Sequence, residues 1–349
     1  MGRERLIRKL LEARREIEPG QDVTIGLFRP EDALGVALAY YEIYGDAFPL
    51  EHVYDPGDII RRNATDDQYT LVARTPGGEV VGLSGLFRSA PNPDLYEAGQ
   101  LMVLKSYRKR NIPARFSEEA LDNLPRRLRI PVIFGEAVCN HLPPQSLLYA
   151  HGLAFTGFEA ECMPSPTTAR EGDVPRNLSL ILMFKIFENA TRETHTPRAY
   201  RAFCQGVYAE LALPRVESPS EEPTGRTAAD QFHLQGAGLL RLTVTRLGKD
   251  FGEAVSAAEA KAGDPGVVQI FLNLGDAAAS WAVDVLRDRG YFLGGLLPYW
   301  FGSDGLLMQK VRLEPDWAAI LVCDPKGAAM RDLIREDYER ATCRKHGIA

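Results

Sequence analysis

Hydrophobic and polar positions along the chain follow two spacings, one typical of strands and one typical of helices. In the first half, strand-like alternation or short apolar runs predict strands at residues 24–28, 69–74, 79–87, 97–104, 131–138, 154–162 and 178–187. Helical spacing predicts helices at residues 3–16, 33–45, 58–63, 112–125 and 145–151. A hairpin followed by alternating helices and strands indicates a mixed sheet of the α/β (α+β) class, flanked by helices.

The second half repeats this alternation after a change in composition. A helix is expected at 200–211, and the Pro-, Ser-, Glu- and Thr-rich segment 214–229 predicts a linker or exposed loop. Further strands are expected at 239–245, 267–274, 292–299, 306–312 and 318–322, with helices at 251–262, 277–289 and 327–343. We therefore predict domains at 1–190 and 231–349, joined by a linker with a helix at 191–230.

One pattern occurs twice along the chain. The pattern consists of a buried strand, a helix, a glycine, and a strand that begins with aromatic residues and contains a second glycine. The two glycines are Gly152 and Gly157 in the first occurrence and Gly290 and Gly295 in the second. The spacing of two glycines arises easily by chance, but the matched order of elements around them favours an internal duplication.

Composition narrows the function classes. At 349 residues the chain is long enough for about two domains, and 45% apolar with 25% charged residues is typical of a globular protein. The net charge of −6 argues against a general nucleic-acid-binding protein. Any anion site must therefore be a local exception to this acidity.

The sequence shows no clear targeting segment and no spacing of cysteines or histidines typical of a metal site. The charged, amphipathic start Met1–Leu11 lacks the apolar stretch of a signal peptide, and no run of about 18 apolar residues occurs, so we expect a cytoplasmic protein without a membrane partner. The 5 cysteines are scattered and show no C-x-x-C arrangement, which predicts reduced thiols. The 6 histidines show no ligand spacing, so no metal is expected.

A basic turn follows the apolar run Leu101–Leu104, which is suited to a buried strand. Pro113 then stands where the first turn of a helix tolerates a missing N–H. The cations around this turn are Lys105, Arg108, Lys109, Arg110 and Arg115. A cationic turn at a helix N-terminus favours anions, because free backbone N–H groups and the helix dipole act in the same direction.

In this order of elements the sequence resembles the GNAT superfamily of N-acetyltransferases, from about Thr24 to Phe187. In that superfamily the fourth strand runs into a turn, Arg/Gln-x-x-Gly-x-Gly/Ala, whose amides hold the pyrophosphate of acetyl-coenzyme A. Here Asn111 stands at the first glycine and Pro113 at the Gly/Ala position. Asparagine tolerates positive φ, so the turn can be kept, whereas proline removes one amide donor.

The part of the chain from Leu239 onward resembles the C-terminal portion of the same superfamily and is interpreted as a degenerate copy. The resemblance thus implies two GNAT-like domains, each a mixed, mostly antiparallel twisted sheet flanked by helices. It also implies acetyl-coenzyme A, or another acyl-coenzyme A, as co-substrate. Its expected contacts are Leu101, Met102, Val103, Arg108, Lys109, Arg110, Asn111, Ile112, Ala114 and Arg115.

Acyl transfer to an amine needs a base for the amine, a polarised carbonyl and an acid for the departing thiolate. The resemblance implies Glu97 as the base, Glu136 as the alternative base, and Tyr149 as the acid. Each has an ordinary structural alternative, since Glu97 can be a surface residue of a strand and Tyr149 can pack its ring on the sheet. Strand amides at residues 101–103 can polarise the carbonyl through a bulge.

The leading hypothesis is an acyltransferase that moves an acyl group from coenzyme A to a small-molecule or protein amine by direct attack in a ternary complex. The alternative is a catalytically weak or inactive tandem protein that acts as an acyl-coenzyme A sensor or protein-interaction module. Transfer to an aminoacyl-tRNA or peptide is a third interpretation, against which the net charge counts. Tyr299 and Trp300 belong to an aromatic segment that suits a cleft lining or a homodimer face.

Overall fold

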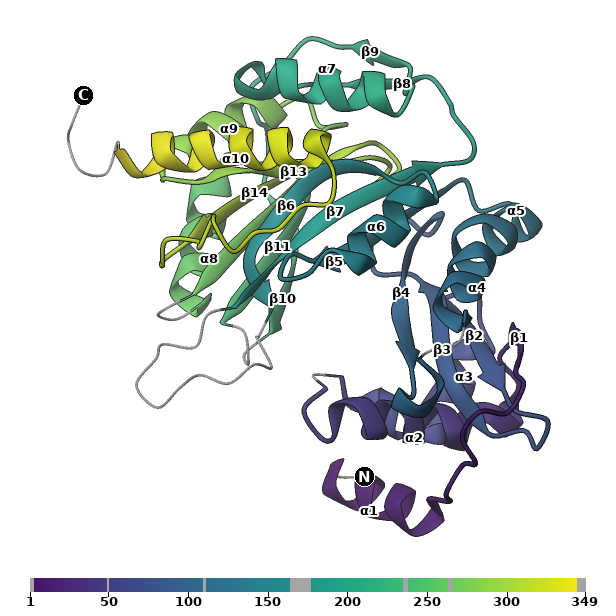
Figure 1. Ribbon diagram of the computed structural model, residues 1–349. Helices are drawn as coiled ribbons and strands as arrows, with labels where there is room; N and C mark the ends of the chain where they lie inside the picture. The colour runs from purple at the N-terminus through teal and green to yellow at the C-terminus, as the bar shows by residue number, and fades with distance from the viewer. Residues whose placement is uncertain are drawn as a thin grey trace. The chain divides into compact units, whose positions relative to one another are not determined.

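The computed structural model describes residues 3–48, 50–108, 111–163, 177–234, 238–262 and 266–343 (Figure 1). The chain forms two compact units, one made of residues 1–89 and 96–133 and the other of residues 90–95 and 134–349. This division differs from the predicted domains at 1–190 and 231–349. Those domains were inferred from the duplication in the sequence, and they stay a prediction. Within the described ranges, none of the helices combines the length and apolar character needed to cross a membrane.

The first unit has an antiparallel sheet in the order β1-β2-β3-β4. Its strands are β1 (Thr24–Leu27), β2 (Gln68–Arg74), β3 (Val80–Phe87) and β4 (Leu95–Val103, with Tyr96 onward in this unit). Its helices are α1 (Arg3–Ala13), α2 (Ala33–Tyr44), α3 (Pro56–Asn63), α4 (Ile112–Glu118) and α5 (Leu124–Leu128). The expected hairpin joins β2 to β3.

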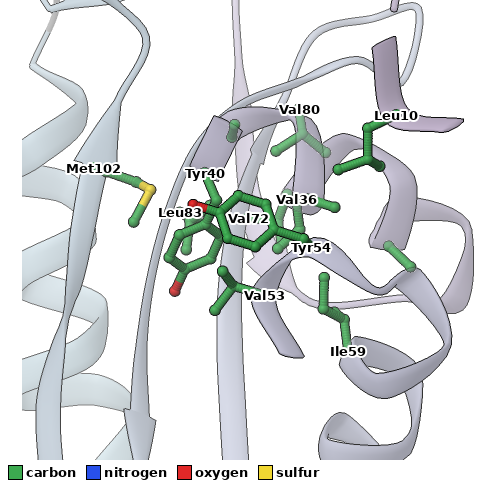
Figure 2. Packing of buried hydrophobic residues seen from close by; sticks show 13 residues of the cluster. Leu10, Val36, Tyr40, Val53, Tyr54, Ile59, Val72, Val80, Leu83 and Met102 are labelled. Carbon is green, nitrogen blue, oxygen red and sulfur yellow. The ribbon is translucent and has the colours of Figure 1, made fainter. Parts of the chain in front are cut away.

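Helices α1, α2 and α3 contribute to one apolar core with strands β2 to β4 (Figure 2). Leu10 of α1, Tyr40 of α2 and Ile59 of α3 are buried in it together with Leu83 of β3 and Met102 of β4. Helix α3 begins at Pro56 because Asp55 accepts a hydrogen bond from the Gly57 N–H, 2.9 Å away. The face of the sheet that carries Leu83 and Met102 is therefore covered by α2.

The sequence predicted that the helix after the basic turn would end near Pro125, but the structure continues it past this residue. A π-helical turn at Glu119–Asn123 connects α4 to α5, and Pro125 lies within the first two positions of α5. A wider i→i+5 turn changes the hydrogen-bonding frame, and proline is tolerated where a new frame begins. The chain thus stays helical to Leu128.

The second unit contains the strand order β5-β7-β6-β13-β14-β12-β11-β10. Its strands are β5 (Val132–Val138, from Phe134), β6 (Ala154–Met163), β7 (Leu178–Ile186), β10 (Ala228–Leu234), β11 (Leu239–Arg246), β12 (Val267–Asn273), β13 (Phe292–Leu297) and β14 (Gly305–Val311). Its helices are α6 (Pro143–Ala150), α7 (Arg201–Glu210), α8 (Phe251–Ala262), α9 (Ala279–Asp288) and α10 (Pro325–Cys343). Pairs β6–β7, β6–β13, β13–β14, β12–β14 and β10–β11 are antiparallel, whereas β11–β12 is parallel.

The repeated sequence pattern has a repeated geometry in this unit. Helices α6 and α9 both end before a glycine with positive φ, Gly152 at 79° and Gly290 at 83°. The next strand is bulged one step before a glycine in both cases, at Gly157 in β6 and Gly295 in β13. These two glycines pair with each other where β6 meets β13. The matching bulges support the internal repeat independently of the sequence spacing.

Two sequence predictions were wrong in this unit. The expected strand at 318–322 is a turn, whose Leu321 N–H donates to the Cys139 carbonyl at 2.8 Å. The segment 214–229 is not simply an exposed linker, because it contains β9 (Arg215–Glu217), which pairs in parallel with β8 (Arg192–Thr194), and the start of β10. The sequence did not predict β8, β9 or β10.

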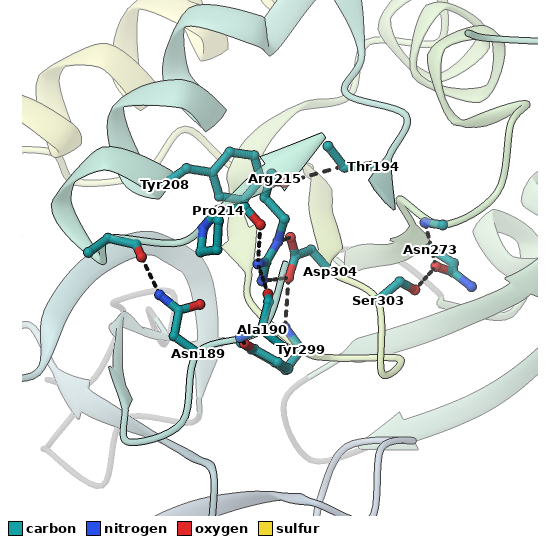
Figure 3. A network of polar contacts seen from close by, with 12 residues as sticks. Asn189, Ala190, Thr194, Tyr208, Pro214, Arg215, Asn273, Tyr299, Ser303 and Asp304 are labelled. Carbon is teal, nitrogen blue, oxygen red and sulfur yellow. Dashed lines mark hydrogen bonds and ion pairs between the residues drawn. The ribbon is translucent and has the colours of Figure 1, made fainter. Parts of the chain in front are cut away.

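Arg215 attaches this segment to the sheet (Figure 3). Its guanidinium forms two bonds with the Asp304 carboxylate, at 2.6 and 3.0 Å, and also donates to the carbonyl of Ala190. The side chains of Arg215 and Asp304 are only 3% and 1% exposed. Asp304 also accepts from the Tyr299 N–H. Residues 189–217 are thus a packed part of the second unit.

Candidate functional site

Strand β4 carries a bulge at the position where the sequence suggested polarising amides. Leu83 pairs with Met102 and Gly85 pairs with Gly99, so Ser84 of β3 faces two residues of β4, Gln100 and Leu101. Gln100 has φ of 58°, in the left-handed region that few residues other than glycine adopt. Bulges of this kind re-aim side chains and are common beside active sites.

The bulge determines the face on which Glu97 lies. An odd step along the chain separates Glu97 from Met102, so a regular strand would place them on opposite faces. Glu97 pairs with Phe87, and Met102 pairs with Leu83, which are alternate residues of β3. Cross-strand pairs share a face, so Glu97 and Met102 lie together on the side covered by α2. A Cβ added to Gly99 would lie 3.7 Å from Glu97 Oε1, so the carboxylate reaches along the strand toward the bulge.

Val103 directs its backbone polar groups to the side of β4 that faces away from β3. The Leu104 N–H donates to the Val81 carbonyl at 2.9 Å, and antiparallel pairing alternates, so the polar groups of Val103 point to the other side. Arg108 Nε donates to the Val103 carbonyl at 3.0 Å. The Arg108 side chain is thus folded back against the end of the strand.

A buried tyrosine, Tyr107, holds the turn after β4 in place. This turn begins with a 3₁₀ turn at Lys105–Tyr107, and the buried Tyr107 donates its hydroxyl to the Glu18 carbonyl at 2.6 Å. Lys105 and Arg108 are exposed. Burial raises the pKa of Tyr44, and the positive charge of Arg108 partly opposes this rise, so the guanidinium lies close to the end of α2.

Asn111 does not use the positive φ that its sequence position allowed. It has φ of −70° and lies just before α4, without capping the helix through its side chain. Arg115 donates to the Val23 carbonyl through both terminal nitrogens, at 3.3 Å, although its side chain stays exposed. Lys109 and Arg110, two of the expected phosphate contacts, lie outside the described residues.

The other expected cofactor contacts differ in accessibility. Leu101, beside the bulge, is 39% exposed, whereas Met102 and Val103 are buried. Ile112 is buried at the start of α4, and Ala114 is half-buried. The side chains of Met102, Val103 and Ile112 are therefore not accessible to a ligand.

The expected acid, Tyr149, lies in α6 of the second unit. Its ring stacks on Phe155 with centroids 5.2 Å apart. Partial burial raises the pKa of its hydroxyl, and the nearby Asp324 carboxylate, which precedes α10, adds to this effect. The ring thus packs on Phe155 of β6.

Glu136, the alternative base, lies half-buried in β5 of the second unit. Burial raises the pKa of Cys162 well above its ordinary value, and the charges of Glu159 and Glu136 add to this effect. Glu159 itself forms an ion pair with Arg241 at 2.6 Å. Glu136 thus lies near a buried polar cluster of the second unit, while Glu97 belongs to the first.

The junction between β11 and α8, which the sequence analysis interprets as part of a degenerate copy, differs in two ways from the junction between β4 and α4. Strands β11 and β12 pair without interruption from Leu239–Val267 to Val244–Leu272. At the start of α8, Asp250 accepts a hydrogen bond from the Thr227 N–H at 2.7 Å, and this contact lowers its pKa to about 2. A closed ladder and a carboxylate at the helix start are unfavourable for a phosphate ligand.

Sequence reasoning missed Ser84 and Gln100. The available signal was the group of small residues Gly82, Ser84 and Gly85, because small residues let backbones approach closely, and Gly85 lies opposite Gly99. No property of Gln100 alone indicates positive φ.

No protein-family model matches the sequence, and no curated protein matches it. Solved structures do resemble it. The ribosomal-protein-S5-alanine acetyltransferase of Vibrio fischeri is 13% identical with a TM-score of 0.39, over 49% of this chain and 95% of that one. A GNAT-family acetyltransferase of Streptococcus pneumoniae is 15% identical with a TM-score of 0.39, over 48% of this chain and 100% of that one. An N-acetyltransferase of Staphylococcus aureus Mu50 is 12% identical with a TM-score of 0.40, over 48% and 99%.

Each of these matches covers about half of this chain. The comparisons do not confirm a second, degenerate copy of the domain, which stays a prediction supported by the repeated geometry of the second unit.

Proposed function

We propose that the protein transfers an acyl group from acyl-coenzyme A to an amine, by direct attack in a ternary complex. The observation that carries this proposal is β4 itself. The strand is bulged at Gln100, holds Glu97 on the face covered by α2, and runs into a cationic turn. A base, backbone amides freed from the ladder and a phosphate-binding turn are thus parts of one short segment.

In this proposal the first unit binds the co-substrate. The exposed cations Lys105 and Arg108 would face the phosphates, and the backbone of Leu101 and Val103 at the edge of β4 would bind the thioester arm. The residues fit such a ligand at the strand edge, where Val103 directs its backbone away from β3. The fit is reduced at the turn, because Pro113 has no N–H to donate.

The test is calorimetry with acetyl-coenzyme A, followed by turnover against a panel of amines. We expect binding in the micromolar range, and Arg108→Glu should weaken it about ten- to a hundredfold, the effect of one lost charge-assisted hydrogen bond. Arg126→Glu is the matched control, since this cation of α5 has a side chain that is 61% exposed. Absence of binding at high micromolar concentration would refute the proposal.

A second function is favoured by a separate observation. Arg115 already donates to the Val23 carbonyl, and Arg108 to that of Val103. Because these cations already donate to backbone carbonyls, they have fewer N–H groups left for phosphates. This suits a protein that binds acyl-coenzyme A weakly and acts as a sensor without turnover. Cofactor binding combined with no product from any amine would support the sensor over the enzyme.

A further inference from the structure

Ser84 is the residue of β3 that faces the bulge. It is 5% exposed, and its Oγ donates to the carbonyl of Gly99 across the strand pair at 3.3 Å. Gly99 immediately precedes Gln100, the residue with positive φ. The hydroxyl therefore contacts β4 at the step where the extra residue enters.

A bulge in β4 makes a hydrogen-bond donor such as the Ser84 hydroxyl favourable at this position. Adding a residue to one strand takes backbone groups out of the ladder, and a buried carbonyl without a partner is unfavourable. Gly85 and Gly99 pair directly beside this step, and neither carries a side chain. The 3.3 Å between Ser84 Oγ and the Gly99 carbonyl oxygen shows that the short serine side chain reaches across from β3 to β4.

The bulge also needs to be held against a competing register. Gln100 adopts a strained conformation that a regular strand would relieve. A regular strand, however, would turn Glu97 to the opposite face from Met102. An interaction present only in the bulged register therefore controls where the Glu97 carboxylate lies.

We propose that Ser84 is a positioning residue for acyl transfer: its hydroxyl stabilises the β4 bulge and thereby holds Glu97 and the backbone of Leu101 in their places. This inference rests on the proposed function, because it assigns Ser84 a role in that reaction. Ser84 acts through β4 and touches neither the acyl group nor the amine.

The test compares three variants of the full chain. Ser84→Ala removes the hydroxyl and Ser84→Thr keeps it. Ser117→Ala is the matched control, since Ser117 is 4% exposed and donates to the Pro113 carbonyl at 3.0 Å, away from the bulge. We expect Ser84→Ala to lower kcat about tenfold or more, with KM for acetyl-coenzyme A changed less than about twofold. Ser84→Thr should restore kcat, and Ser117→Ala should leave it unchanged.

A second readout does not depend on activity. Nuclear Overhauser contacts between the backbones of Gly85 and Gly99, taken together with those between Leu83 and Met102, report the bulged register. We expect one of these two sets to weaken in Ser84→Ala, and both to persist in the other two variants. An unchanged kcat together with unchanged contacts in Ser84→Ala would overturn the inference. A wild-type protein that turns over no amine would instead refute the proposed function, and the contacts would then decide the role of Ser84 in the bulge.

Discussion

At the scale of single residues, Glu97 lies on the face covered by α2 because Gln100 adds one residue to β4. Its carboxylate extends along the strand beside Gly99, where an added Cβ would lie in ordinary contact with it at 3.7 Å. The proposed base is therefore positioned by backbone geometry as well as by its own side chain.

Glu97→Gln should lower kcat by about a hundredfold or more, because an amide cannot accept the proton of the attacking amine. Affinity for acetyl-coenzyme A should change little, since the cationic turn remains intact. Steady-state kinetics and calorimetry on the same preparation check both statements. Glu118→Gln on the exposed surface of α4 is the control. Equal loss in the two variants would contradict the role of Glu97.

At the scale of elements, the junction of β6 and β13 depends on two facing glycines. A Cβ on Gly157 would lie 2.4 Å from the Gly294 carbonyl oxygen and 2.5 Å from the Cα of Gly295. Such distances are too short for any side chain, so the strands would have to separate. The repeated glycine spacing in the sequence thus corresponds to close backbone contact between the two copies of the repeat.

Gly157→Ala should destabilise the protein by about 1–3 kcal/mol, the usual cost of overpacking a well-packed site. Gly206→Ala provides a contrast, because Gly206 lies inside α7 with no atom within 4 Å of the added Cβ. There alanine should stabilise by about 0.5–1 kcal/mol through its higher helix propensity. Urea denaturation monitored by circular dichroism measures both changes, and a neutral Gly157→Ala would show that the junction can open without cost.

The segment from β8 to β9 is attached to the sheet by one buried ion pair. Asp304→Ala would leave the Arg215 guanidinium buried without its carboxylate, and removal of one partner of such a pair costs about 3–5 kcal/mol. We expect this loss in the free energy of unfolding. Glu339→Ala breaks the exposed Arg335–Glu339 pair and should have little effect. Similar losses in both variants would argue against the attachment.

At the scale of the whole molecule, the two strand–turn–helix junctions are chemically unequal. The first is bulged and cationic, whereas the second has a continuous β11–β12 ladder and Asp250 at the helix start. Because Asp250 has a pKa of about 2, it remains negatively charged at neutral pH and repels phosphate.

We therefore predict that each chain binds one molecule of acetyl-coenzyme A. Isothermal titration should give a stoichiometry near one, and Arg108→Glu should weaken that single binding event. Asp250→Asn should leave the stoichiometry unchanged, because the closed ladder remains. Two binding events per chain would show that the second junction is functional.

Most helices and strands followed from the sequence, because each depends on the periodicity of its own residues. Helix α8 was predicted at its observed bounds, and strands β2 and β3 to within one residue at either end. The repeated glycine spacing could be read for the same reason, whereas the duplication inferred from it stays a prediction. The basic turn after β4 could also be recognised, since charge and a helix start are local properties.

Features that depend on distant residues were decided only by the tertiary structure. The bulge at Gln100 arises from the register against β3, and residues 189–217 pack where they do because Arg215 meets Asp304, far away in the chain. The chain likewise stays helical through Pro125 because of a π-helical turn, which no local sequence pattern predicted. The amino-acid sequence by itself determined which elements form and where the positive charge of the turn lies. The pairing of β3 with β4 decided the face of Glu97, because register is set by partners that a local pattern does not contain.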